Sequence, residues 1–188
     1  MRFAAVVARM WLACACLAQE MPVPVFGTTV VDNGGLRGTI YYLKPSTGVL
    51  PDNFHRFQPK GTIYTRSLNV TPRFFKEGFP GVTKRVEWFA IDYEGKFWIE
   101  KAGEYRFALT SDDGSLLYID DVLLVINDGV HPPRTREGLV KLARGVHTLR
   151  VPYFQGPRES VALVLEVAGE GESLRVFSMD EFTPPPSN

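Results

Sequence analysis

From residue 36 onward, short apolar or alternating runs are separated by turn-forming residues. Alternation with period two is typical of strands that bury one face, and it is clearest over residues 105–110. The pattern predicts strands at 36–43, 86–92, 96–99, 105–110, 116–119, 122–126, 138–142, 146–153 and 161–167, with a weaker candidate at 62–65. About nine strands, turn signals every 8–12 residues and no long amphipathic helix predict a single all-β domain, an antiparallel β-sandwich.

Three local patterns lead to more specific expectations. The sequence Tyr93-Glu94-Gly95 predicts a turn, and so does Asp120-Asp121. The run 122–126 is entirely apolar and predicts a central strand buried on both faces. Residues 71–83 contain two prolines and two glycines and predict a long loop. We expect the three phenylalanines of that loop to close one end of the core: Phe74, Phe75 and Phe79.

The first residues have the pattern of an export signal. Arg2 and Arg9 precede an apolar run that ends in small residues at Cys16-Leu17-Ala18. This predicts a signal peptide over residues 1–18 and a secreted, periplasmic or cell-surface protein. A buried N-terminal helix and lipidation at a cysteine remain open alternatives. Cleavage would remove both cysteines, so the mature chain would have no disulfide and no thiolate metal site.

Charge and length limit the partners. The 188 residues include 21 basic and 21 acidic side chains, a balance that argues against a basic nucleic-acid footprint. There is no stretch of 18 apolar residues, so we predict no membrane span. Nothing in the composition indicates an oligomeric state.

The sequence lacks the common catalytic and cofactor motifs. The three histidines do not have zinc-ligand spacing, and no nucleophile elbow, phosphate loop or dinucleotide fingerprint occurs. Carboxylates are plentiful, but their spacing does not indicate the pair of a glycosidase. We therefore predict that the chain is not an enzyme.

Several segments, in this order, resemble one known family. They are Gly-Glu-Tyr-Arg-Phe at 103–107, Ser-Asp-Asp-Gly-Ser at 111–115, Leu-Tyr-Ile-Asp at 117–120 and Gly-Val-His-Thr-Leu-Arg-Val-Pro-Tyr at 145–153. Residues 35–42 are similar to the family's opening strand. The chain thus resembles the PA-fourteen (PA14) domain, a protective-antigen-like β-sandwich found in flocculin-type adhesins and as an insert in glycosidases. The resemblance covers residues 26–168, and leaves 19–25 as a loose lead and 169–188 as a polar, proline-rich tail.

The resemblance implies a calcium-dependent lectin site. In lectin members of the family, two adjacent aspartates joined by a cis peptide bond hold calcium, and the ion grips sugar hydroxyls. Carried over, these ligands are Asp112 and Asp113. Neighbouring side chains of an extended strand point to opposite faces, so both can reach one ion only if the backbone between them is unusual.

Calcium takes 6–8 oxygen ligands, so other loops would have to complete the site. The family's loop corresponds to 154–160, which lacks an asparagine and contains Arg158, a charge that opposes a cation. The candidates for further ligands are Asn127, Asp128, Gln155 and Glu159.

Two other interpretations remain open. Asp-Asp-Gly is also ordinary hairpin chemistry, in which case the chain is a structural or protein–protein interaction module without metal or sugar. A domain associated with a glycan hydrolase is the more distant alternative. The preferred prediction is an exported, non-catalytic, carbohydrate-binding module with a glycan or cell-surface polysaccharide as partner and calcium as cofactor.

Overall fold

Eleven strands form two antiparallel sheets over the residues that the structure describes, 25–185, in a computed structural model of the chain. The predicted signal peptide and almost all of the loose lead lie outside these residues. The strands are β1 (Leu36–Tyr42), β2 (Pro59–Thr65), β3 (Asn69–Phe74), β4 (Phe89–Ile99), β5 (Gly103–Asp112), β6 (Ser115–Ile119), β7 (Val122–Asn127), β8 (Arg134–Leu142), β9 (Gly145–Gln155), β10 (Ser160–Ala168) and β11 (Arg175–Val176). A short 3₁₀ helix, η1 (Phe54–Arg56), lies between β1 and β2.

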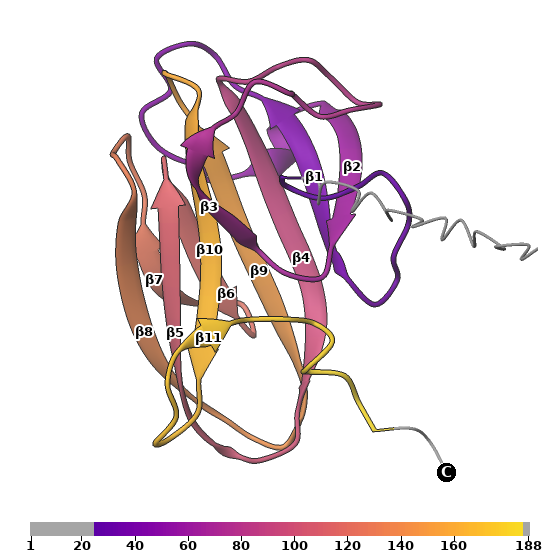
Figure 1. Cartoon of the computed structure of the whole chain (residues 1–188), viewed down its shortest axis with the longest axis vertical. Coiled ribbons are helices and arrows are strands. Elements are labelled where there is room, and N and C mark those ends of the chain that lie inside the picture. Colours follow the sequence, from indigo (N-terminus) through magenta and orange to yellow (C-terminus); the bar gives the residue numbers. More distant parts are fainter. Residues whose placement is uncertain (1–24, 186–188) are drawn as a thin grey trace, which may run out of the picture.

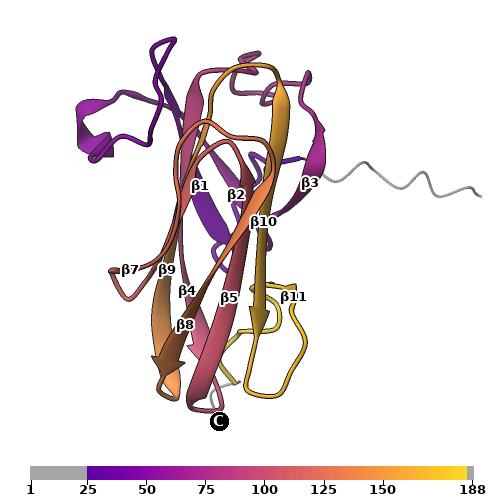
Figure 2. The same cartoon turned by 90° about the vertical axis from the view of Figure 1, so that its left-hand side faces the viewer.

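The two sheets face each other, as Figure 1 and Figure 2 show. One sheet has the order β2-β1-β4-β9-β6-β7, and the other has the order β11-β10-β5-β8, with β3 also paired to β10. Apolar residues that alternate along each strand fill the space between the sheets and form one large buried cluster. The prediction of an all-β antiparallel sandwich is confirmed. Within residues 25–185 we find no helix of the length and apolarity that a membrane crossing needs.

The predicted turn at Tyr93-Glu94-Gly95 is wrong, because these residues lie inside one continuous strand, β4. β4 pairs with β9 over its whole length, from Phe89 opposite Gln155 to Ile99 opposite Gly145. Gly95 has a packing role instead: a Cβ there would lie 2.6 Å from Cδ2 of Leu36. The glycine therefore allows β1 to lie close against β4.

The prediction that 122–126 is a central, doubly buried strand is also wrong. Within the described residues, β7 is an edge strand whose one partner is β6, and Val122 and Ile126 are mostly exposed. Val125 alone of this run is fully buried. An apolar run shows that burial is favourable but does not give the strand's place in the sheet.

The predicted loop at 71–83 contains part of a strand. β3 pairs with β10, and its Pro72 falls where the register between the two strands shifts. Proline is tolerated at such an irregular edge. Phe75 and Phe79 do close the core, as predicted, whereas Phe74 is exposed.

The chain continues to contribute to the core beyond residue 168, so the prediction of a polar tail over 169–188 is wrong for this part of the chain. β11 pairs with β10, and the residues after it include three buried apolar side chains, Phe177, Met179 and Phe182. The rings of Phe177 and Phe182 are stacked, with their centroids 4.9 Å apart, and both rings pack against Phe97. These apolar residues are widely spaced and show no strand or helix periodicity. The sequence pattern therefore did not predict their burial.

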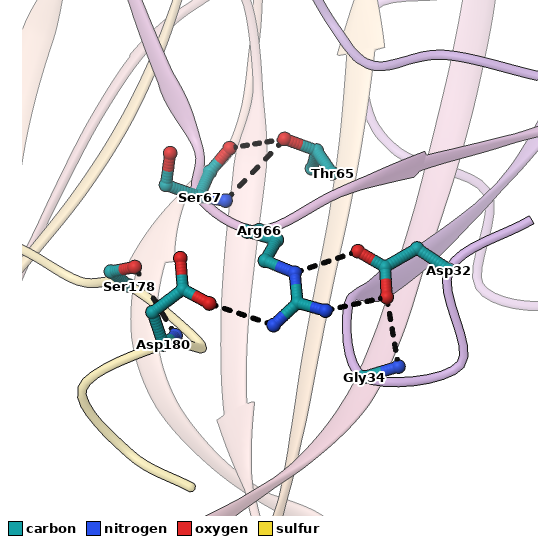
Figure 3. Close-up of polar contacts among 7 residues, drawn as sticks. All are labelled: Asp32, Gly34, Thr65, Arg66, Ser67, Ser178 and Asp180. Carbon is teal, nitrogen blue, oxygen red and sulfur yellow. Dashed lines mark hydrogen bonds and ion pairs between the residues drawn. The ribbon is translucent and has the colours of Figure 1, made fainter. Parts of the chain in front are cut away.

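A polar cluster fastens the first and last described segments to the sandwich (Figure 3). The guanidinium of Arg66, in the β2–β3 turn, donates to both carboxylate oxygens of Asp32 at 2.8 and 2.9 Å. It also donates to Asp180 Oδ1 at 2.7 Å. We call Arg66, Asp32 and Asp180 the Arg66 clasp.

Candidate functional site

Asp112 ends β5, and Asp113 begins the turn to β6. The peptide bond between them is cis, as the resemblance to the PA14 family implies. Both side chains are buried, with 6% of Asp112 and 3% of Asp113 exposed. Two adjacent acidic residues are therefore held at one end of the sandwich with little contact with water.

Hydrogen bonds from two other loops hold the Asp113 carboxylate. Its Oδ1 accepts from the backbone N–H of His131 at 3.0 Å, in the β7–β8 loop. Its Oδ2 accepts from the backbone N–H of Gly156 at 2.7 Å, in the β9–β10 loop. Both oxygens thus face loops that meet at this end of the molecule.

Asp112 is less completely bonded. Its Oδ2 accepts from the Ser160 hydroxyl at 3.0 Å, and its backbone oxygen lies 2.7 Å from the hydroxyl of Tyr153. Oδ1 of Asp112 accepts no hydrogen bond from any residue between 25 and 185. This oxygen is free to bind something other than the protein.

The electrostatics of the pair are unfavourable to charge. Burial raises the pKa of Asp113, against the effect of its two backbone hydrogen bonds and of His131. Burial also raises the pKa of Asp112; the hydrogen bond from Ser160 and attraction to His131 oppose this rise, and repulsion from Asp113 adds to it. Ionisation of both carboxyl groups is therefore less favourable in the folded protein than in water.

No ion pair compensates this cost. Neither aspartate forms a salt bridge within the described part of the chain. The side chain of His131 is engaged elsewhere, with its ring nitrogens 2.9 Å from the backbone oxygens of Asn127 and Pro132. A bound cation would supply the missing positive charge.

Gly114 completes the Asp-Asp-Gly sequence for a reason of space. A Cβ at Gly114 would lie 2.3 Å from Cε1 of Phe154 and 2.6 Å from Oδ1 of Asp128. Both distances are shorter than real Cβ contacts, so only glycine fits here without displacing these neighbours. The turn brings the aspartates against β9 and the β7–β8 loop.

Three of the four further ligand candidates lie near the pair, and the side chain of each forms hydrogen bonds with the protein. Asn127 donates to Ser111 Oγ at 3.0 Å and accepts from Arg134 Nε at 2.8 Å. Oδ1 of Asp128 accepts from the backbone N–H groups of Leu50 and Gly129, at 2.9 and 2.8 Å.

Gln155 bridges strands close to Asp112. Its Nε2 donates to the Ser160 backbone oxygen at 2.9 Å, and its Oε1 lies 2.7 Å from the Tyr153 hydroxyl. Glu159, by contrast, is half-buried, and its Oε2 lies 4.0 Å from Lys76 Nζ in an ion pair. The structure therefore keeps Gln155 near the pair and pairs Glu159 with a surface lysine.

Reasoning from the sequence missed the groups that contact the pair directly. They are the backbone N–H groups of His131 and Gly156 and the hydroxyl groups of Tyr153 and Ser160. Gly156 and Ser160 belong to the loop 154–160, which the resemblance already placed beside the site. Their position near the pair could therefore have been predicted from the sequence. Nothing in the sequence indicated the contact from His131, because its backbone N–H, and not its side chain, donates to Asp113.

The pair contributes two carboxylates to the candidate site. Between residues 25 and 185, no group of three or more His, Cys, Asp or Glu side chains is placed to hold a metal ion. Hard carboxylate oxygens that have no ion-pair partner in the described chain suit calcium, whose other ligands can be backbone oxygens, water or hydroxyls of a bound molecule. The pair thus fits the acidic part of a calcium site and supplies fewer than half of its ligands.

Comparison with known proteins agrees with the fold. The family model of the PA14 domain matches residues 76–176. Comparison with curated protein sequences gives no match. The match to the PA14 family model includes the Asp112–Asp113 pair and all of the loops that contact it.

Three solved structures illustrate the similarity. A PA14 sugar-binding domain from an RTX adhesin has a TM-score of 0.63 at 19% identity, covering 78% of this chain and 96% of that one. The A domain of epithelial adhesin 9 from Candida glabrata, in complex with Galβ1-3GlcNAc, has a TM-score of 0.58 at 12% identity and covers 87% of this chain and 95% of that one.

The third is an anti-sigma factor domain-containing protein, with a TM-score of 0.60 at 20% identity. The match covers 82% of this chain but 48% of that protein, so this chain spans about half of its length. At these identities the similarity establishes the fold.

Proposed function

The chain belongs to the PA14 domain family, and from this premise we propose that it is an exported, non-catalytic carbohydrate-binding module whose Asp112–Asp113 pair holds calcium. The observation that carries the proposal is the pair itself: two adjacent buried carboxylates with raised pKa values and no ion-pair partner in the described chain. A purely structural turn has no need to bury two uncompensated acids.

The kind of ligand is inferred from similar structures. One is described as a sugar-binding domain, and another is in complex with the disaccharide Galβ1-3GlcNAc. Both share the sandwich and cover most of this chain. A glycan is therefore the partner class that we propose for the end of the sandwich where the β5–β6, β7–β8 and β9–β10 loops meet.

Asp112 and Asp113 would be the charged ligands of the ion. Oδ1 of Asp112 is available, and each oxygen of Asp113 accepts only one hydrogen bond from the described chain. When bound, calcium would supply positive charge that attracts sugar hydroxyl oxygens. His131 and Gly156 would keep the Asp113 carboxylate in place through their backbone N–H groups.

Export is proposed from the sequence pattern at residues 1–18, which lie outside the described residues. Extracellular fluids and the periplasm are settings in which a surface glycan is accessible. We accordingly propose a secreted, periplasmic or cell-surface location.

A protein-interaction module is the second candidate, and one observation favours it. The edge strand β7 exposes the apolar side chains Val122 and Ile126, and Leu139 on β8 is also exposed. Exposed apolar side chains on an edge strand are typical of surfaces that pair with another chain. This candidate predicts no response to calcium.

Thermal unfolding of the purified protein with increasing calcium tests the proposal. Binding to the folded state alone adds about 2.7 kcal/mol at a calcium concentration one hundred times Kd. For a domain of this size that corresponds to a rise in Tm of about 5–10 °C. The Asp113→Asn variant should lose this increment. Glu170→Gln, a change at an exposed residue without hydrogen bonds in the described chain, should keep it.

A glycan array probed with and without calcium then tests the ligand class. The proposal expects one or more glycans to bind in the presence of calcium and not in its absence. An unchanged Tm at millimolar calcium would contradict the calcium site. A calcium response without binding to any glycan would contradict the carbohydrate partner.

A further inference from the structure

The outer face of the six-stranded sheet carries large charged and aromatic side chains in register. Across β1, β4, β9 and β6, one row contains Arg37, Glu94, Arg150 and Tyr118. Residues opposite each other on antiparallel neighbours point to the same face, so these side chains share one surface. This surface faces away from the sandwich core.

Two projecting segments turn this surface into a groove. Figure 2 shows the segment around η1 and the β6–β7 turn projecting from the same side of the sandwich. A cavity of about 550 Å³ lies along this face, lined by Asp52 and Asn53 beside η1 and by Asp121 in the β6–β7 turn. Its size is within the range of small-molecule sites.

A second hollow extends the groove along the same strands. It measures about 370 Å³ and shares Arg37, Glu94, Asp121 and Arg150 with the first. It continues past Thr148 at the other end. The two hollows together offer room for a ligand longer than a single ring.

The centre of the groove is a rigid ion pair. Asp92 is buried and accepts two hydrogen bonds from Arg150, at 2.8 Å from Nε and 3.0 Å from Nη2. The guanidinium also lies 5.5 Å from the centre of the Tyr118 ring and 6.0 Å from that of Phe54. Such bidentate and ring contacts fix the direction of the guanidinium.

Polar groups remain unused around this fixed centre. Nη1 of Arg150 makes no hydrogen bond with the described residues. Arg37, Glu94 and Asp121 form no ion pair with them either. The groove thus presents both donors and acceptors that the fold itself does not employ.

We propose that this groove binds a neutral saccharide chain without a metal ion. Sugar hydroxyls both donate and accept, so they match a surface that alternates carboxylates with guanidinium groups. The half-buried rings of Tyr41 and Tyr118 offer flat apolar surface for the C–H faces of sugar rings.

Charge narrows the class of ligand. The lining of the two hollows includes four carboxylates, of Asp52, Asp92, Glu94 and Asp121, against three cationic side chains, of Arg37, Lys96 and Arg150. These charges nearly balance, so the groove has no cationic surplus with which to attract a polyanion such as a uronate chain or a nucleic acid. The two guanidinium groups between the carboxylates would repel a lysine-rich peptide. A neutral chain avoids both penalties.

The groove is independent of the proposed calcium site. Neither hollow is lined by Asp112, Asp113 or any residue that contacts them. Binding here is therefore expected to persist in EDTA and in Asp113→Asn. Failure of the calcium proposal would leave this inference untouched.

NMR titration of the isotope-labelled protein in EDTA tests the inference. The probes are cellohexaose, mannohexaose and N-acetylchitohexaose, with hexalysine as the peptide comparator. At millimolar concentration, at least one saccharide should shift backbone signals of β1, β4, β9 and β6 around Arg37, Glu94, Arg150 and Tyr118. Hexalysine should not.

Variants at exposed or half-exposed positions connect these shifts to the groove. Glu94→Gln and Tyr118→Ala should each weaken saccharide binding about tenfold, the loss expected for one charge-assisted hydrogen bond or one ring contact. Glu104→Gln, an exposed change on β5 in the other sheet, should leave binding unchanged. The spectra of the variants themselves report whether the fold is intact.

Three results would overturn the inference. One is the absence of shifts with every neutral hexasaccharide. Another is binding of hexalysine in place of the saccharides. The third is a set of shifts confined to the loops around Asp112 and Asp113.

Discussion

Asp32 and Asp180 share the guanidinium of Arg66, whereas Asp112 and Asp113 lie next to each other and form no ion pair with the described residues. The first two are partly exposed to water, and the other two are buried. The hydrogen bond and charge of Arg66 lower the pKa of Asp32, while burial raises the pKa of Asp112 and Asp113. The Arg66 clasp thus contains its own ion pairs, whereas the buried pair has none within residues 25–185.

The difference shows where function is to be sought in such a fold. An exposed acid is stabilised by water and by any nearby base, so it reveals little about a ligand. A buried acid that the fold leaves uncompensated costs stability, and a ligand that supplies the opposite charge recovers that cost. Asp112 and Asp113 meet this second description.

Gly114→Ala should have the largest effect on the pair. The new Cβ would meet Phe154 at 2.3 Å and Asp128 at 2.6 Å, so β9 or the β7–β8 loop must shift. We expect a loss of about 3 kcal/mol, at the upper end for overpacking, and loss of calcium binding.

Urea unfolding of Gly114→Ala measures this loss. Gly103→Ala at the other end of β5 is the matched control, because nothing lies within 4 Å of its Cβ. Its stability should stay within about 0.5 kcal/mol of the wild-type protein. Equal stability of the two variants would contradict the tight packing at the pair.

Asp112→Asn should separate calcium binding from folding. The asparagine oxygen can still accept from Ser160, and the variant removes the repulsion with Asp113. In EDTA its Tm should equal or exceed that of the wild-type protein. With calcium, it should lack the rise of about 2.7 kcal/mol expected at one hundred times Kd.

Differential scanning calorimetry of Asp112→Asn gives its Tm in EDTA and the rise in Tm on addition of calcium. Asp32→Asn, the same change in the Arg66 clasp, should behave in the opposite way, with a lower Tm in EDTA and an intact response to calcium. If Asp112→Asn instead unfolds at a clearly lower temperature in EDTA, the carboxylate is structural.

The two regions should also respond to pH in opposite directions. The pKa values of Asp112 and Asp113 are raised in the folded state, so they favour folding when protonated. Their contribution is lost as pH rises from the ordinary value of 3.8 through the folded pKa values. The lowered pKa of Asp32 favours folding above 3.8, and its contribution is lost as pH falls below that value.

Calcium-free stability against pH, measured for wild type, Asp112→Asn and Arg66→Ala, resolves these contributions. The wild-type protein should lose stability relative to Asp112→Asn between pH 4 and neutrality. Its advantage over Arg66→Ala should shrink as the pH falls below about 3.8. Parallel curves for all three proteins would show that neither region titrates as described.

Arg66→Ala should have the smallest effect at neutral pH. Its ion pairs are exposed, and such pairs contribute little and are screened by salt. We expect a slight fall in the urea midpoint that diminishes further in 1 M salt, with calcium binding unchanged. A fall as large as that of Gly114→Ala would mean that the clasp, and not only the core, holds the terminal segments in place.

The sequence pattern predicted the sandwich because burial on alternate positions is local information. The pattern gave wrong predictions where the structure of a segment depends on the strands packed beside it. Val122–Ile126 is apolar, but β7 lies at the end of the six-stranded sheet, with β6 as its one partner among the described residues. Gly95 resembles a turn residue, yet its lack of a side chain serves the packing of Leu36.

The candidate site was only partly predictable for the same reason. Asp112 and Asp113 were placed by resemblance, and their adjacency in the chain guaranteed that they lie together. The donors that hold them, from His131 and Gly156, are backbone groups that any residue but proline could supply. Asn127 was a reasonable ligand candidate, but its contacts with Arg134 and Ser111 are visible only in three dimensions.

Isothermal titration of the protein with calcium tests the central claim most directly, because it counts the ions that the buried pair holds. We predict one calcium ion per chain, with binding lost in both Asp112→Asn and Asp113→Asn and retained in Asp32→Asn. Absence of binding heat over a range of temperatures, or equal binding by all three variants, would contradict the claim that Asp112 and Asp113 form a cation site.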